Sequence, residues 1–143
     1  MGEPRHLTIP KEAADTLSPL KEKIRSAPFL PFLDYKVCLE EKIIDETIPF
    51  VKSLPRLAGD ASYSHVWVTV VHFERSASIP VPPESTAAIV PVHIVNKGAK
   101  VAGHQLVEGD YWEITKDEQV EPDFYALLVL FEKSEATAVN DEA

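Results

Sequence analysis

The sequence predicts an α+β domain in which short N-terminal helices pack on a mainly antiparallel β sandwich or barrel. Residues 63–74 (YSHVWVTVVHFE) and 124–132 (FYALLVLFE) are mainly apolar on both alternating faces. That pattern is typical of strands inside a sheet that is covered on both sides. Helical spacing of apolar residues occurs earlier, in residues 11–25 and 45–57. A length of 143 residues, 45% of them hydrophobic, suits one domain with its own core.

The first 25 residues are predicted to be an extended arm followed by helix. Residues 1–10 contain two prolines and show no periodicity. In residues 11–25, apolar side chains recur every three or four positions. Ser18 before Pro19 fits a helix N-cap followed by a first-turn proline, which favours two short helices over one kinked helix.

The next segments are predicted as connector, strand and helix. Residues 27–33 (APFLPFL) contain two prolines, which exclude a central strand and leave a buried connector or an exposed docking segment. Residues 35–44 alternate as a strand with one solvent-facing side. Residues 45–57 carry an apolar helical stripe, with Asp45 or Thr47 as candidate caps.

The C-terminal half is predicted to be mainly strand. Residues 75–85 form a proline-rich connector, and residues 86–95 resemble a strand. Pro91 removes a hydrogen-bond donor from that strand, so we expect an edge position or a bulge. Residues 96–98 suit a short hairpin turn. The acidic tail, residues 134–143, has too few apolar residues to pack and is expected to fray.

We expect a single domain over residues 1–143, because no internal repeat or long linker interrupts the chain. The one cysteine, Cys38, excludes an internal disulfide and is expected to be a packed or idle thiol, not a nucleophile. No apolar run approaches the roughly 18 residues of a membrane span. The N-terminus MGEPRHLTIP lacks the apolar core of a signal peptide. These features predict a soluble protein that is not secreted and is cytoplasmic or assembled into a particle.

The net charge of −9 is concentrated in the second half of the chain. Residues 76–143 hold four Lys and Arg against twelve Asp and Glu. The densest acidic segment comprises Glu108, Asp110, Glu113, Asp117, Glu118, Glu121 and Asp123, and is predicted to be largely a loop. Such a surface repels phosphate backbones and anionic lipids, so direct binding to nucleic acid or membrane is disfavoured. It would attract a basic protein surface, or serve only as a solvated loop.

Established catalytic motifs are absent from the sequence. The five glycines cannot form GxGxxG or a P-loop, and neither HExxH nor GxSxG occurs. A single cysteine excludes CxxC zinc sites. We therefore expect no cofactor and no enzymatic activity.

The histidines offer one candidate metal site. His72 and Glu74 lie on the same face of the predicted strand 63–74. Together with His104 or His93 from a neighbouring strand, they would form a site with two histidines and one carboxylate. Packed or exposed histidines are more common on strands, so we assign no metal to the chain.

Aromatic side chains near the acidic segment and in the proline-bearing segments are candidate contacts for a protein partner. The candidate interface residues are Tyr111, Trp112, Glu113, Phe29 and Phe32. Trp67, in contrast, is expected to belong to the core.

Three functions remain open. The first is a non-enzymatic structural or interaction subunit of a larger assembly, of the kind found as decoration or assembly components of virions, with a protein partner or self-association. The second arises because residues 103–114 (GHQLVEGDYWEI) are similar to the strand and Gly-Asp turn of cupin-type barrels. That resemblance implies a barrel that binds a small molecule or a metal, with or without enzymatic activity, although the cupin histidine cluster has no match here. The third is an acidic inhibitor of a basic site.

Overall fold

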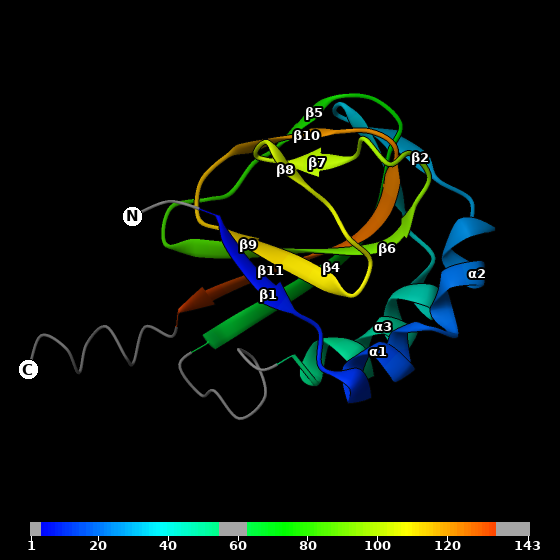
Figure 1. Ribbon diagram of the computed structural model, residues 1–143. Coiled ribbons are helices and arrows are strands. Elements are labelled where there is room, and N and C mark those ends of the chain that lie inside the picture. Colours follow the sequence, from blue (N-terminus) through cyan, green and yellow to red (C-terminus); the bar gives the residue numbers. More distant parts are fainter. Residues whose placement is uncertain (1–3, 55–62, 134–143) are drawn as a thin grey trace, which may run out of the picture.

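The computed structural model describes residues 4–54 and 63–133, which form two antiparallel sheets and three helices (Figure 1). In spatial order, the strands of the seven-stranded large sheet are β1 (Arg5–Thr8), β9 (Asp110–Ile114), β6 (Ser85–Ile94), β11 (Phe124–Lys133), β4 (Tyr63–Phe73), β3 (Tyr35–Cys38) and β2 (Leu30–Phe32). The four-stranded small sheet contains β5 (Ala77–Ile79), β10 (Glu118–Glu121), β7 (Lys100–Val101) and β8 (His104–Gln105). The helices are α1 (Lys11–Leu17), α2 (Leu20–Arg25) and α3 (Glu41–Lys52). The predicted α+β class is confirmed, and the described strands form two open sheets.

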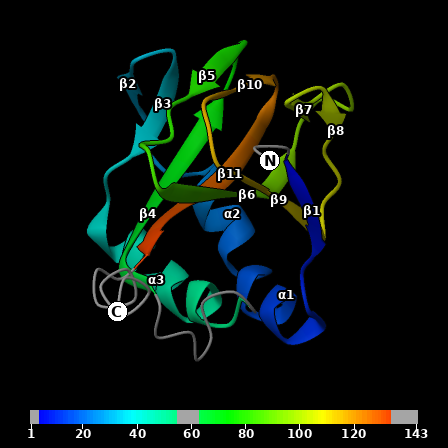
Figure 2. The ribbon, with the colours of Figure 1, turned by 90° about the vertical axis from the view of Figure 1, so that its left-hand side faces the viewer.

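The large sheet separates two hydrophobic cores. Figure 2 shows the three helices gathered on one side of this sheet and the small sheet on the other. On the helix side, Phe50 of α3 packs with Cys38 and Leu127, all fully buried. On the other side, Phe73 and Phe124 pack with residues of the small sheet. Cys38 is therefore a packed thiol, as predicted.

Strands β4 and β11 form the middle of the large sheet, as the sequence predicts. They pair along their whole length, from Phe124 opposite Phe73 to Lys133 opposite Tyr63. The expectation that Trp67 is a core residue is wrong, because its side chain is 48% exposed. The small sheet covers the end of β4 that carries Phe73 and leaves the end that carries Trp67 open.

The N-terminal arm belongs to the sheet. Residues 5–8 are extended as expected, but they pair with β9 as an edge strand instead of reaching away from the domain. The helical segment 11–25 divides into two helices, as predicted, but Ser18 is not the N-cap of the second helix: it is the C-cap of α1, and Pro19 is the N-cap of α2. The segment containing Leu30–Phe32 forms the opposite edge of the same sheet.

The boundary between β3 and α3 differs from the prediction. The strand ends at Cys38, and the helix begins at Glu41 and contains Pro49, so neither Asp45 nor Thr47 is its cap. The buried helical face already begins at Ile43, which the sequence analysis assigned to the strand.

Pro91 lies at a bulge, as predicted, but β6 is an inner strand. The register between β6 and β11 shifts between Tyr125 and Ala126, opposite His93 and Pro91. Pairing of β6 with β9 ends at Ile89, so the ladder on that side stops before Pro91.

Two predicted loops contain short strands. The connector 75–85 includes β5, and the acidic segment includes β10, which pairs with β5 and β7. The predicted fraying of residues 134–143 concerns a segment outside the described residues. Within the described part of the chain, no helix is long and apolar enough to cross a membrane.

Candidate functional site

His72 is the centre of a polar cluster at one end of the large sheet. Its Nε2 lies 2.8 Å from Oδ1 of Asp123, and its Nδ1 lies 3.6 Å from Oε1 of Glu74. Its ring stacks on Tyr125, with the ring centres 3.9 Å apart and 11° between the planes. The ring of Phe29 meets His72 edge-on at 5.9 Å. Both imidazole nitrogens therefore face carboxylates, while the ring itself is packed between aromatic side chains.

An open cavity of about 350 Å³ adjoins this cluster. Its lining includes Leu33, Tyr35, Lys36, His72 and Glu74. Nζ of Lys36 lies 2.6 Å from Oε1 of Glu74, and the hydrogen bond from Lys36 lowers the pKa of that carboxyl group. Burial raises the pKa of Tyr35. The Lys36, Glu74 and His72 side chains at the cavity thus already pair with one another.

The three residues of the candidate metal site do not meet. His72 and Glu74 are neighbours, but His104 stacks on Trp112, with ring centres 4.4 Å apart. Nδ1 of His93 instead lies 4.0 Å from Glu108. Within residues 4–54 and 63–133, no group of three His, Cys, Asp or Glu side chains is arranged to hold a metal ion.

Asp123 is the member of the His72 cluster that the sequence analysis did not single out. It was grouped with the acidic segment, although it immediately precedes β11. Antiparallel pairing places Phe124 opposite Phe73 and Tyr125 opposite His72. This register brings the start of β11 to the end of β4, and no local pattern in the sequence shows it.

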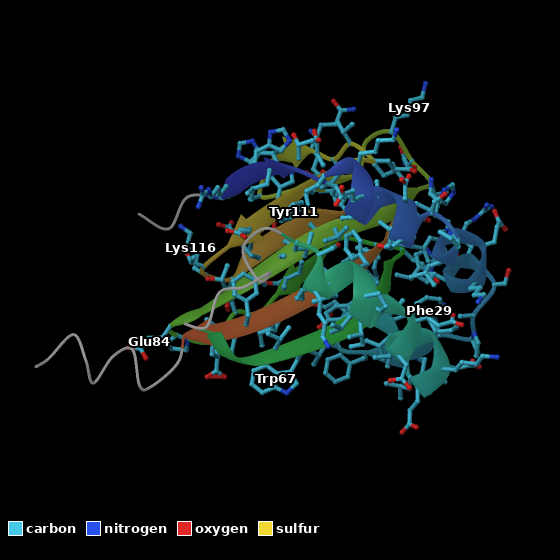
Figure 3. The ribbon with its side chains drawn as sticks, turned by 90° about the horizontal axis from the view of Figure 1, so that it is seen from below. Phe29, Trp67, Glu84, Lys97, Tyr111 and Lys116 are labelled. Atoms are coloured by element: carbon cyan, nitrogen blue, oxygen red, sulfur yellow. The ribbon has the colours of Figure 1, made fainter. Side chains whose placement is uncertain are left out.

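Two candidate interface residues are buried within the chain. Tyr111 is 1% exposed and belongs to the core beneath the helices, and Glu113 is 4% exposed. Neither side chain is accessible to a partner at the surface of this fold. Both lie on β9, which is paired with β1 on one side and β6 on the other. Figure 3 shows Tyr111 among the inner side chains of the molecule.

The other three candidates differ in how accessible they are. Trp112 is half-buried between two imidazoles, with ring centres 4.8 Å from His6 and 4.4 Å from His104. Phe29 packs against Tyr125 as well as His72. Phe32 on edge strand β2 is 50% exposed. Of these residues, Phe32 offers the most open apolar surface.

Much of the acidic segment is engaged inside the chain. Glu108 accepts hydrogen bonds from Lys21 and from the backbone N–H of Ile94. Partial burial works to raise the pKa of Glu108, but these contacts, led by Lys21, lower it below its usual value. Oδ2 of Asp110 lies 2.9 Å from Nε2 of His6. Asp117 accepts a hydrogen bond from the backbone N–H of Val81, which follows β5. These carboxylates therefore make contacts that hold segments of the same chain together.

Exposed apolar side chains lie on strands β2 and β4 and on the segment that follows β3, in the part of the large sheet that ends at β2. We call them the lateral apolar surface, which consists of Leu30, Phe32, Leu39, Val66 and Trp67. Register places Leu30 and Trp67 on the face that carries the small sheet, because Leu30 pairs with Val37 and Val37 with Val71. Figure 3 shows Trp67 at the outer margin of the molecule beside β4.

No protein-family model matches the chain, and no curated protein is significantly similar to it. The case for function therefore rests on the surfaces and clusters described above.

Proposed function

We propose that this protein is a non-enzymatic interaction subunit, which binds another protein molecule through the lateral apolar surface. The observation that carries the proposal is the exposure of Trp67, together with that of Leu30, Phe32, Leu39 and Val66, in the part of the large sheet that ends at β2. Exposing a large aromatic side chain beside further apolar residues costs hydration free energy, which a protein contact recovers. Tryptophan is also among the residues most enriched at the energetic centres of interfaces.

The polar cluster around His72 supports the same proposal. The carboxylates of Asp123 and Glu74 pair with His72 and Lys36, respectively. The imidazole ring is covered by Tyr125 and Phe29. This arrangement fixes the junction of β4, β11 and the segment before β2. It gives the cluster a structural role in holding the strands that carry the lateral apolar surface.

Site-specific photocrosslinking tests the proposal. A photoreactive phenylalanine analogue is placed at position 39 or 67 of the full chain, and at position 107 as a control. Val107 is 54% exposed but lies between β8 and β9, away from the lateral apolar surface. We expect protein adducts, with a copy or another protein, from positions 39 and 67 and not from position 107. Equal yields at the three positions, or adducts from position 107 alone, would contradict the proposal.

A second candidate function is the binding of a small ligand in the cavity beside His72. The observation in its favour is that His72 and Glu74 are neighbours at this cavity, with Lys36 in reach. Calorimetry with zinc and the full chain tests whether the ligand is a metal ion. Stoichiometric binding that is lost in His72→Ala would favour it over the interaction subunit.

A further inference from the structure

The cavity beside His72 is lined by charged groups of both signs. Nζ of Lys36 lies 2.6 Å from Oε1 of Glu74, the residue that follows β4. Nε of Arg75, the next residue, donates a 3.4 Å hydrogen bond to the backbone oxygen of Asp34. All four residues line the cavity. Two cationic and two acidic residues therefore surround one space.

This balance of charge narrows the class of ligand. The chain as a whole has a net charge of −9, whereas Lys36 and Arg75 offset the two acidic residues of the cavity. A simple anion drawn to Lys36 is repelled by Glu74, and a simple cation drawn to Glu74 is repelled by Lys36. A molecule that carries an ammonium and a carboxylate joined through one carbon atom offers each of these groups an opposite charge.

The charged groups of the cavity are accessible to such a ligand. The side chains of Lys36 and Glu74 are 41% and 43% exposed, and an exposed ion pair adds little to stability, so both groups can turn toward a ligand. The hydrogen bond from Lys36 lowers the pKa of Glu74, which therefore stays ionised at neutral pH. The planar guanidinium of Arg75 suits a carboxylate, which it can bind through two parallel hydrogen bonds.

An apolar side chain at the rim of the cavity gives a second, independent observation. Leu33 lines the cavity, lies in the turn between β2 and β3, and is 68% exposed. Its φ is +54°, in the left-handed region that favours glycine and strains a leucine. A strained residue that also exposes a large apolar side chain indicates a functional role for that side chain. An apolar group of a ligand that packs on Leu33 and Pro31 removes this surface from water.

We propose that this cavity binds a small α-amino acid with an apolar side chain. Its carboxylate binds Arg75 and Lys36, its ammonium group binds Glu74, and its side chain packs on Leu33. The inference rests on the second candidate function and names the class of its ligand. The cavity volume of about 350 Å³ lies at the lower end of the range of roughly 300–1,000 Å³ for small-molecule sites, as a ligand of this size requires. The end of a peptide carries only one of the two charges and does not fit.

The test is isothermal titration calorimetry of the purified full chain with L-leucine. We expect one molecule to bind per chain, and N-acetyl-leucine and leucinamide, which each lack one charge, to bind at least tenfold more weakly. Arg75→Gln and Glu74→Gln should each raise the dissociation constant for L-leucine at least tenfold. The matched controls, Arg25→Gln and Glu22→Gln, make the same changes in the exposed ion pair of α2 and should leave binding unchanged. Circular dichroism checks that all four variants are folded.

Leu33→Gly separates a binding role of this side chain from a structural one. Glycine adopts the positive φ without strain, so the variant should keep or raise the melting temperature of the wild type while it binds L-leucine more weakly.

Three results would overturn the inference: no binding of L-leucine at millimolar concentration, equal affinity for N-acetyl-leucine or leucinamide, or binding that survives Arg75→Gln and Glu74→Gln. Zinc binding that is lost in His72→Ala, without binding of L-leucine, would support the second candidate function and still overturn this inference. Protein adducts from positions 39 and 67 report on the interaction subunit independently of both.

Discussion

Val66 and Trp67 are neighbours in the chain, lie on opposite faces of β4, and are both about half exposed. Their exposure is unusual because β4 is an inner strand at its other end, where Val70, Val71 and Phe73 are fully buried. The strand is thus covered at Val70, Val71 and Phe73 and exposed at Val66 and Trp67. The proposed function depends on this change along a single strand.

Truncating the core should cost far more stability than truncating the lateral apolar surface. Leu127 is fully buried between the helices and the large sheet, so Leu127→Ala should lower the free energy of unfolding by about 2–5 kcal/mol. Trp67→Ala, in an exposed position, should cost less than about 1 kcal/mol in the monomer. Chemical denaturation at low protein concentration measures both. A larger loss for Trp67→Ala would show that the indole serves the fold of its own chain.

The contact between Lys21 and Glu108 should make stability depend on pH in the acidic range. The folded-state pKa of Glu108 is lowered, so its contribution is complete above the unfolded pKa and disappears as the pH falls through the folded value. Glu108→Gln should therefore lower stability at pH 7 by about 1 kcal/mol, a small value because the pair is partly screened by solvent.

Denaturation of wild type and Glu108→Gln across pH 7 to pH 2.5 measures this effect. The two stability curves should converge at the acidic end, where Glu108 is protonated in both states. A difference that stays constant over the whole range would show that the carboxylate charge is not responsible. The exposed carboxylate Glu22, which pairs with Arg25 on the surface of α2, provides a matched control as Glu22→Gln.

His72→Ala should affect stability but not association. The substitution removes the stacking on Tyr125 and the 2.8 Å contact with Asp123, and should cost about 1–3 kcal/mol. The His72→Ala variant should keep the native mass of the wild-type protein, because the lateral apolar surface does not include this residue. Light scattering and thermal denaturation on the same sample separate the two effects. Loss of association in a folded His72→Ala variant would place the contact near the cavity instead.

The sequence predicted the central pair of strands because both faces of β4 and β11 are apolar, and covered strands need this pattern. It failed for Trp67, since periodicity gives the face on which a residue lies but not whether another layer covers that part of the face. It also failed for the start of α3, because residues 39–44 fit both strand alternation and the first helical turn. The helix forms there because it lets Ile43 pack in the core.

The candidate site shows the same limit. His72 and Glu74 were found by their shared face, whereas Asp123 required knowledge of the strand register. Tyr111 and Glu113 seemed exposed because acidic residues surround them in sequence, yet the strands on either side of β9 bury them. Contacts between distant segments decide these cases, and local patterns do not encode them.

The most direct test of the account is the native mass of the protein in extracts of cells that naturally produce it, compared with that of Trp67→Glu produced in the same cells. An interaction subunit predicts that the wild-type chain elutes at a mass clearly above its own 15.9 kDa. The variant should shift to the mass of a single folded chain, because a charge replaces the indole on the lateral apolar surface. A wild-type chain that elutes as a monomer, or a Trp67→Glu chain that keeps the larger mass, would contradict the account.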